Sequence, residues 1–461
     1  MKVLQINSVC GYGSTGRIAA DLSRYLTQSG DDCLIAYGRG QAPDDVKSFR
    51  IGTDLAVNLH GVCSRITDKH GFYSKRATQR FIRSAGEYDP DIIHLHNLHG
   101  YYLHLPTLFE WLRECGKPIV WTLHDCWAFT GHCSYFDFVG CDRWKTGCHD
   151  CPQKREYPAS FVMDHSESNF KEKKEWFTSI PKLQIITPSN WLKDLAKQSF
   201  FKNYPIATIH NGIDLNQFKP TGSSFREKNH LTNKTMLLSV ANVWESRKGF
   251  DYLLELSQRL DDTFCIVVVG LTEQQCHSLS NHMLGITRTD DLNELVKIYS
   301  AADIFLNPTL EDNYPTTNLE AIACGTPVIT FDTGGCSETV SAGCGYVVPK
   351  GNLEEMISQV KRLGSIHYQM NHEKWLTHRN FNGSKNTVSK NCSPLSSVCL
   401  IVQYFDRKGG LRGRYETHCL CIIGILSIFF CCGYLCQSCG FLPKNSLSYY
   451  DPFCKEPLRS E

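Results

Sequence analysis

The chain has 461 residues, of which 42% are hydrophobic and 21% charged, and its formal net charge is +1. This length is enough for two or three domains, and the hydrophobic content excludes a wholly disordered chain. Because no global charge favours nucleic acid, we expect no nucleic-acid partner, and any bound anion must be held by a local site.

The N-terminus and the cysteines indicate the cellular compartment. Residues 1–9 show no basic region followed by a long apolar run, so no signal peptide is predicted and the start of the chain is expected to be cytoplasmic. The 23 cysteines are spread over a chain far too long for a disulfide-stapled miniprotein, with 14 before residue 390 and nine after it. Reduced thiols with one metal cluster fit this distribution better.

Residues 1–215 alternate short apolar runs with helical patterns. Expected strands are 3–7, 33–37, 92–96, 119–123 and 183–187. Near-continuous apolar runs that alternate with helices predict a parallel sheet covered on both faces. A polar stretch at 216–234, with Pro220 and Gly222, resembles a linker.

The pattern restarts at 235–363. Strands are expected at 236–241, 264–270, 303–308 and 327–331, with helices at 250–260 and 292–302 between them. The sequence therefore predicts an α/β protein of two doubly wound domains in series. The carboxyl ends of both sheets should face a cleft, where ligands bind.

The order breaks at about Gly364, and residues 364–461 read as an irregular C-terminal tail. Within it, 419–436 is an uncharged stretch of 18 residues, the lower limit for a membrane-spanning helix. Basic residues before it, Arg407 to Arg414, would keep that flank cytosolic. Three interpretations stay open: a membrane span, a buried helix, and a tail of altered reading frame that does not belong to the fold.

A glycine motif follows the first expected strand. Gly11, Gly13 and Gly16 match G-x-G-x-x-G, which permits a tight turn and brings an anion close to a helix N-terminus. A dinucleotide site would need an acidic residue at the end of the second strand, where Arg39 stands instead, so NAD is disfavoured and NADP is a minor alternative. A tight turn that binds nothing is the other interpretation.

Two segments of the second domain carry charged side chains where strands end and helices begin. Arg247 and Lys248 precede a glycine and a helix, and adjacent Arg and Lys suit a diphosphate, although a solvated surface pair is the commoner role of such residues. Glu311, Asp312 and Glu320 follow a later strand, and a path from loop to helix can bring Asp312 and Glu320 into one pocket.

A third segment, Gly334-Gly335, is a glycine turn at another expected helix start. In their order and spacing, the three segments resemble glycosyltransferase family 4, with its GT-B fold of two Rossmann-like domains, over about residues 1–363. The resemblance also covers Gly13 to Gly16, which it explains without a dinucleotide, and Asn211 in the segment that joins the domains.

The resemblance implies roles for these residues. Lys248 and Arg247 would hold the diphosphate of a nucleotide-sugar donor, and Glu320 would accept the ribose hydroxyls. Asp312 stands at the first acid of the E-x7-E motif, where the family usually has Glu, so either Asp312 or Glu311 would reach the sugar.

Family members also often carry a histidine near the donor sugar, at the end of a strand of the first domain. His124 stands at such a place. A hydrogen-bonded histidine at a strand end is an equally good interpretation.

A cysteine-rich insert occupies residues 126–152. Cys148 and Cys151 have the C-x-x-C spacing of a metal knuckle, and Cys133 with Cys141 would complete four thiolates for a structural Zn²⁺. We expect the insert to have too few apolar residues to fold alone, so a metal would supply folding energy. Free thiols and a disulfide are the alternatives. The insert resembles the colanic-acid branch of the family.

The predicted function is a retaining glycosyltransferase of hexosyl type, which needs no cofactor for catalysis. The acceptor would be a glycan or lipid-linked hydroxyl in the assembly of a cell-surface polysaccharide or lipopolysaccharide, at the cytoplasmic face of the inner membrane. Two alternatives remain: a nucleotide-sugar epimerase of the same fold, and a catalytically impaired protein that docks on a membrane.

Overall fold

The computed structural model describes residues 1–289, 291–340 and 343–369. The tail from residue 370, with the segment 419–436 and the three interpretations of it, lies outside these residues. Among the helices of the described ranges, none combines the length and the apolar character that crossing a membrane requires.

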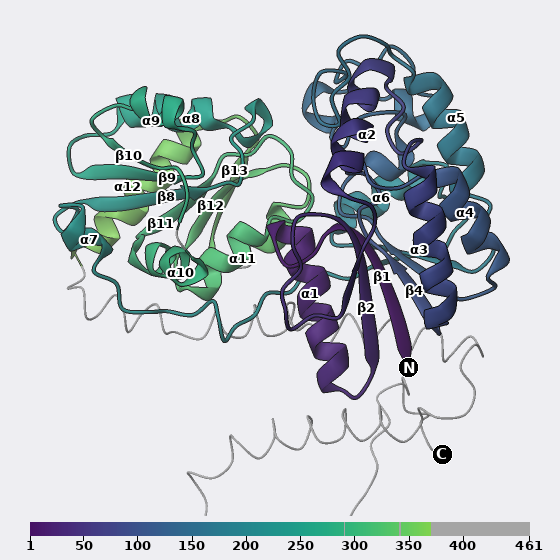
Figure 1. The fold of residues 1–461 in the computed structure, drawn as a ribbon. Coiled ribbons are helices and arrows are strands. Elements are labelled where there is room, and N and C mark those ends of the chain that lie inside the picture. Colours follow the sequence, from purple (N-terminus) through teal and green to yellow (C-terminus); the bar gives the residue numbers. More distant parts are fainter. Residues whose placement is uncertain (290, 341–342, 370–461) are drawn as a thin grey trace, which may run out of the picture. The chain divides into compact units, whose positions relative to one another are not determined.

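The first domain is built on a seven-stranded sheet in which every adjacent pair is parallel (Figure 1). Its order is β3-β2-β1-β4-β5-β6-β7. The strands are β1 (Lys2–Val9), β2 (Asp32–Arg39), β3 (Ser48–Arg50), β4 (Ile92–Leu95), β5 (Ile119–Thr122), β6 (Leu183–Thr187) and β7 (Ile206–Thr208). The five predicted strands are all present, and the sheet gains a short strand at each edge.

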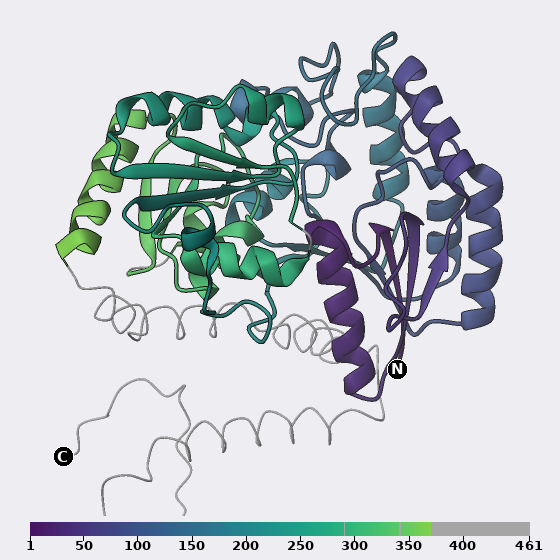
Figure 2. The same cartoon turned by 60° about the vertical axis from the view of Figure 1, so that its left-hand side comes forward.

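Helices cover both faces of this sheet, as predicted from its apolar strands. They are α1 (Gly13–Gln28), α2 (Asp54–Thr67), α3 (Lys75–Tyr88), α4 (Leu105–Glu114), α5 (Ser166–Phe177) and α6 (Asn190–Gln198). Leu22 and Leu26 of α1 pack with Val3 and Cys33 on one face, whereas the large core around Phe81 lies on the other. Figure 2 shows α1 beside β1 and β2.

The second domain repeats this plan with a six-stranded parallel sheet of order β10-β9-β8-β11-β12-β13. The strands are β8 (Thr235–Val240), β9 (Phe264–Val269), β10 (Met283–Ile286), β11 (Ile304–Asn307), β12 (Val328–Asp332) and β13 (Gly345–Pro349). The helices are α7 (Phe225–Lys228), α8 (Phe250–Arg259), α9 (Glu273–His277), α10 (Leu292–Ala301), α11 (Thr316–Ala323) and α12 (Leu353–Gln369).

Two separate cores lie on the two faces of the second sheet. Tyr299 of α10 and Leu319 of α11 pack on one face, and Leu256 of α8 with Met356 of α12 pack on the other. The predicted linker 216–234 contributes Phe218 and Leu231 to the first of these cores. It is therefore packed chain that belongs to the second domain, in place of an extended polar connection.

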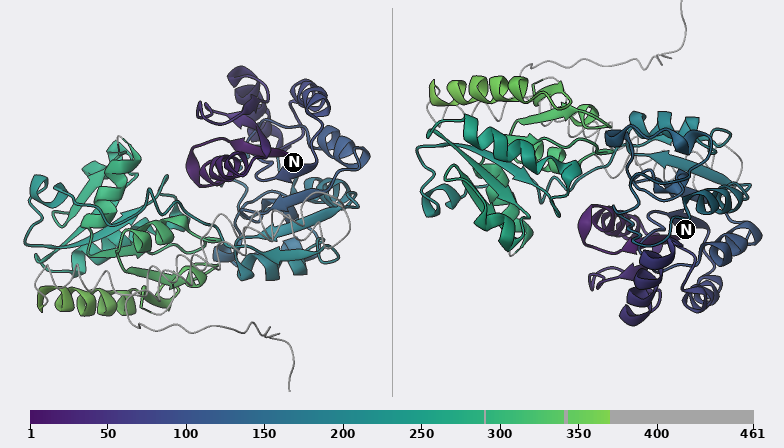
Figure 3. Two further views of the ribbon diagram at one scale, coloured as in Figure 1. Left: turned by 90° about the horizontal axis from the view of Figure 1, so that it is seen from below. Right: turned by 90° about the horizontal axis from the view of Figure 1, so that it is seen from above.

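Helix α12 runs past residue 363, where the second domain was expected to end (Figure 3, light green). Met356, Ile357, Val360 and Leu363 are all buried and lie at helical spacing, so this helix closes one face of the second sheet. The irregular tail predicted from Gly364 therefore begins at least six residues too early.

Candidate active site

The loop after β11, residues 309–314, carries the two predicted acids and is called the donor loop below. Lys248 Nζ donates to Asp312 Oδ2 at 2.5 Å, and Arg247 Nη1 lies 4.0 Å from the same oxygen. Burial raises the pKa of Asp312, but the two cations outweigh it and hold that pKa below its ordinary value. The structure thus brings Lys248, Arg247 and Asp312 together, with the carboxylate ionised.

Arg247 is buried, and its charge is balanced from several sides. Its Nη1 donates to the backbone oxygen of Glu311 at 2.7 Å, and its guanidinium lies 3.8 Å from the ring centroid of Tyr135 in the first domain. Tyr135 and Asp312 raise the pKa of Arg247 in spite of the opposing effect of burial. A buried and permanently charged guanidinium at a strand end can stabilise an anion strongly.

Glu320, on α11, is 2% exposed and both of its oxygens are engaged. Tyr299 donates its hydroxyl to Oε2 at 3.0 Å, and Arg17 Nη2 donates to Oε1 at 2.9 Å. Arg17 comes from α1 of the first domain and was missed by the sequence analysis. Its position directly after Gly16, near the N-terminus of a helix that begins in the glycine motif, was the available signal.

The side chain of Glu311 contacts the first domain. Its side chain is fully buried, and its carboxylate accepts hydrogen bonds from the backbone amides of Phe136 at 3.2 Å and Phe138 at 3.0 Å. Burial raises the pKa of Glu311 to about 7, against the effect of these two amides. Of the two acids between which the sequence left the choice open, Asp312 is therefore the one beside the cations.

The predicted glycine turn, Gly334-Gly335, packs against the donor loop. A Cβ at Gly334 would stand 1.9 Å from the oxygen of Asp312, and one at Gly335 would stand 1.9 Å from the oxygen of Asn313. The amide of Gly335 also donates to the oxygen of Asp312 at 3.0 Å. These glycines are needed for the close approach of the two loops, which fixes the backbone that carries Asp312.

The glycine motif of the first domain forms a turn closed by a hydrogen bond from the Gly11 amide to the Gly16 oxygen at 2.9 Å. Gly13 has φ of +63° and begins α1, and Gly16 packs against Val9. The turn therefore sets the start of α1, from which Arg17 reaches Glu320.

His124 follows β5, and its backbone contacts the donor loop. Its backbone oxygen accepts from Asn313 Nδ2 at 3.0 Å, and its Nε2 shares a hydrogen bond with His96 Nδ1 at 3.0 Å. Burial lowers the pKa of His124 to about 4, so the ring is neutral at pH 7.

Further contacts join the strand-end loops of the two domains. Ser189, after β6, donates its hydroxyl to Asn313 at 2.6 Å, and Glu338 accepts from the amides of Asn190 and Trp191 at the N-terminus of α6. Asn211, the predicted residue at the domain junction, lies 3.5 Å from the oxygen of Tyr314 in the donor loop. The loops at the carboxyl ends of both sheets thus meet at the predicted site residues.

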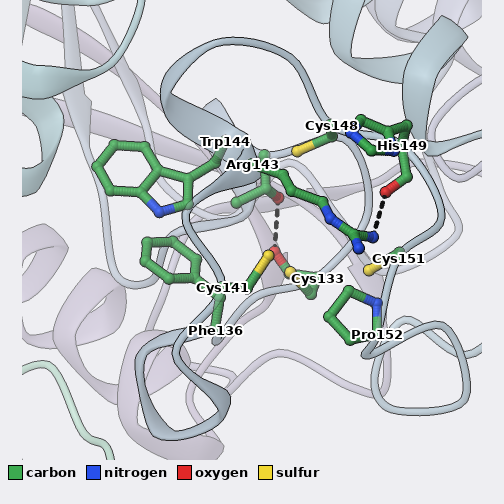
Figure 4. Close-up of a pocket in the computed structure, with 10 residues that line it drawn as sticks. Cys133, Phe136, Cys141, Arg143, Trp144, Cys148, His149, Cys151 and Pro152 are labelled. Atoms are coloured by element: carbon green, nitrogen blue, oxygen red, sulfur yellow. Dashed lines mark hydrogen bonds between the residues drawn. The ribbon is translucent and has the colours of Figure 1, made fainter.

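The four cysteines of the predicted metal site line one small pocket (Figure 4). Cys133, Cys141, Cys148 and Cys151 are free thiols that come from three stretches of the insert. The Gly131 amide donates to Cys148 Sγ at 3.1 Å, and a hydrogen bond from Cys133 lowers the pKa of Cys151 to about 7. In the described part of the chain, however, no group of three or more His, Cys, Asp or Glu side chains is arranged to hold a metal ion.

The insert is less dependent on a metal than the sequence suggested. Phe129, Phe136 and Trp144 are buried in the core of the first domain, and the rings of Phe136 and Trp144 stack with centroids 4.9 Å apart. The expectation that the insert lacks apolar residues was therefore wrong, because a few large aromatic side chains supply the buried area that a count of residues misses.

Comparison with known proteins agrees with this arrangement. Residues 15–217 match the family model described as Glycosyltransferase Family 4, and residues 234–365 match the one described as Glycosyl transferases group 1. A curated relative is the putative colanic acid biosynthesis glycosyl transferase WcaC of Escherichia coli K12, 26% identical over 78% of this chain and 90% of its own.

Solved structures share the fold at lower identity. Sucrose-phosphate synthase from Thermosynechococcus elongatus superposes with a TM-score of 0.64 at 16% identity, over 88% of this chain and 99% of its own. Anabaena HepE in complex with UDP-glucose gives 0.59 at 15% identity, over 88% and 100%.

Two parallel α/β domains whose strand-end loops meet around paired cations and carboxylates define a glycosyltransferase of the GT-B class. The chain carries a glycosyltransferase family 4 domain followed by a group 1 glycosyl transferase domain. The family resemblance inferred from the sequence is confirmed.

Proposed function

We propose that this enzyme transfers a sugar from a nucleoside-diphosphate sugar to a hydroxyl of a glycan or lipid-linked acceptor, with retention of anomeric configuration, in polysaccharide assembly. The observation that carries the proposal is the cluster of Lys248, Arg247 and Asp312 at the strand ends of the second domain. The name of the WcaC relative and the UDP-glucose bound to HepE support the substrate class.

The residues of the cluster take separate roles in this proposal. Lys248 and Arg247 bind the diphosphate and stabilise the negative charge that grows on it as the sugar departs. Asp312 then exchanges Lys248 for a hydroxyl of the donor sugar, and Glu320 exchanges Arg17 for the ribose hydroxyls. His124, neutral and held by His96, presents an imidazole to the sugar from the first domain.

The reaction itself replaces one bond to the anomeric carbon by another. The bond between that carbon and the diphosphate oxygen breaks, and the acceptor oxygen bonds to the same face of the sugar. The leaving phosphate takes the proton of the acceptor hydroxyl. Arg247 and Lys248 are positioned by their protein partners before the donor arrives, so little reorganisation is needed at the moment of reaction.

A donor screen tests the proposal. We expect a UDP- or GDP-sugar to raise the melting temperature of the protein, because a ligand that binds only the folded state stabilises it. NMR of the product should show the anomeric configuration of the donor. An inverted product would contradict retention, and conversion of the donor to another nucleotide sugar without acceptor would identify an epimerase instead.

We also propose that the four cysteines of the insert bind a structural Zn²⁺, which plays no part in the transfer. Support comes from the common pocket of Cys133, Cys141, Cys148 and Cys151 and from the amide that already donates to a sulfur there. Binding would require the side chains to turn toward a common centre. The metal would tie together a loop that contributes Phe136 and Phe138 to the domain contact.

We propose further that the enzyme works in the cytoplasm at a membrane surface. Leu55, Leu59, Val62 and Ile66 lie on one face of α2 and are 46–78% exposed. The exposed segment 161–163 joins this face, since the amides of Phe161 and Met163 donate to the oxygens of Arg65 and Ile66. A continuous apolar surface of this kind suits the interfacial region of a bilayer.

Vesicle binding tests the membrane proposal. We expect sedimentation with phosphatidylglycerol-containing vesicles to fall at least about fivefold in the double variant Leu59→Asp/Phe161→Asp. The variant loses two apolar side chains that the wild type would bury in the bilayer interface. Leu215→Asp changes an exposed leucine elsewhere and should sediment like the wild type. Equal sedimentation of all three proteins would contradict a role for this surface.

A further inference from the structure

The cysteine-rich insert meets the donor loop through one short segment, residues 135–138. Two kinds of contact join them. The amides of Phe136 and Phe138 donate hydrogen bonds to the Glu311 carboxylate, and the ring of Tyr135 lies against the Arg247 guanidinium. The partners are more than 100 residues apart in sequence and belong to different domains.

These contacts act on the same stretch of backbone. Arg247, held by Tyr135, donates to the oxygen of Glu311, and the Glu311 side chain is held by the insert. The next residue is Asp312, the partner of Lys248. The Glu311–Asp312 peptide is thus fixed from the first domain on two sides, through its carbonyl and through its preceding side chain.

We propose that segment 135–138 positions the donor loop, with Tyr135 and Glu311 as positioning residues that set where Arg247 and Asp312 stand relative to the donor. This inference rests on the proposed function, since it assigns the insert a role in donor use. It also gives the insert a task beyond its own folding: the donor loop adopts its working geometry only while the first domain is in place.

The burial of the contacts gives them their strength. Glu311 is fully buried, and hydrogen bonds shielded from water are electrostatically stronger than exposed ones. A nearby contact serves as a contrast: Lys350 Nζ lies 3.4 Å from Asp137 Oδ2 and also joins the insert to the second domain, but both side chains are partly exposed. An exposed pair of this kind contributes little.

Tyr135→Leu tests the proposal, with Tyr135→Phe as the conservative variant and Lys350→Ala as the control for domain contact. We expect Tyr135→Leu to lower kcat/KM for the donor about tenfold, because a desolvated cation–π contact is lost. Tyr135→Phe keeps the ring and should have kcat/KM close to that of the wild type. Lys350→Ala should stay within about twofold of the wild type. Glu311→Gln should weaken donor use in the same direction as Tyr135→Leu.

Hydrogen exchange of residues 309–314, measured on the same proteins without donor, gives a readout that does not depend on activity. Faster exchange in Tyr135→Leu and Glu311→Gln, but not in Lys350→Ala, supports the proposal. Exchange and donor kinetics like the wild type in both variants would overturn it. Absence of any donor turnover by the wild type would count against the proposed function, while the exchange result would still decide whether the insert positions the loop.

Discussion

Replacement of Lys248 by alanine is expected to reduce glycosyl transfer about 100-fold. The ammonium is the side-chain cation that pairs with Asp312 at 2.5 Å, and in the proposed reaction it stabilises the departing diphosphate. Removal of one preorganised group that stabilises developing charge costs about 3 kcal/mol of barrier. Initial rates at saturating donor, measured by release of the nucleoside diphosphate, give the value.

Two further variants serve as comparisons for Lys248→Ala. Lys202→Ala removes an exposed lysine of the first domain and should retain full activity. Lys248→Arg keeps the charge but changes its shape, and an intermediate rate is expected. Undiminished turnover by Lys248→Ala, in protein whose melting temperature is unchanged, would refute the diphosphate role of this residue.

Purified enzyme is expected to contain about one Zn²⁺ per chain, and Cys148→Ser is expected to lose it. The melting temperature of this variant should fall by at least about 5 °C, because structural zinc contributes its binding energy to folding. The variant should still fold, since Phe129, Phe136 and Trp144 remain packed in the core. Elemental analysis and thermal melts measure the two quantities.

Cys115→Ser is the matched control, because Cys115 is a partly buried thiol at the end of α4 and does not line the pocket. Its zinc content and melting temperature should equal those of the wild type. A wild-type protein that is purified without zinc, and that melts at the same temperature as Cys148→Ser, would show that the four cysteines are plain thiols. Mass spectrometry under non-reducing conditions would reveal a disulfide between them.

The sequence predicted the inner strands of both sheets and missed their edges. Inner strands such as β9 are buried on both faces and appear as unbroken apolar runs, which alternate with helices. The four missed strands, β3, β7, β10 and β13, are the outermost members of their sheets. They are three to five residues long and only partly buried, and runs this short are weak signals for a strand even where they are apolar, as in β10 and β13.

The site was predictable where charged residues follow strands, and only there. Lys248 and Asp312 follow strands β8 and β11, and the structure brings these two side chains together. Glu320 lies farther along the chain, on α11, where it pairs with Arg17 and Tyr299. Arg17 and Tyr135 were missed because their roles depend on contacts between domains, which leave no local pattern. The position of Glu311 was undecided for the same reason, since only the amides of the insert distinguish it from its neighbour.

The pairing of cations with carboxylates in the resting enzyme has a consequence for turnover. Lys248 with Asp312, and Arg17 with Glu320, have their charges compensated before any substrate arrives. In the proposed reaction, the donor must replace these ion pairs when it binds. Breaking them costs free energy, which would lower the affinity for both the donor and the nucleoside diphosphate product. In the proposed reaction, each carboxylate would compete to pair with its cation again once the sugar has left, and this competition would help to release the nucleoside diphosphate.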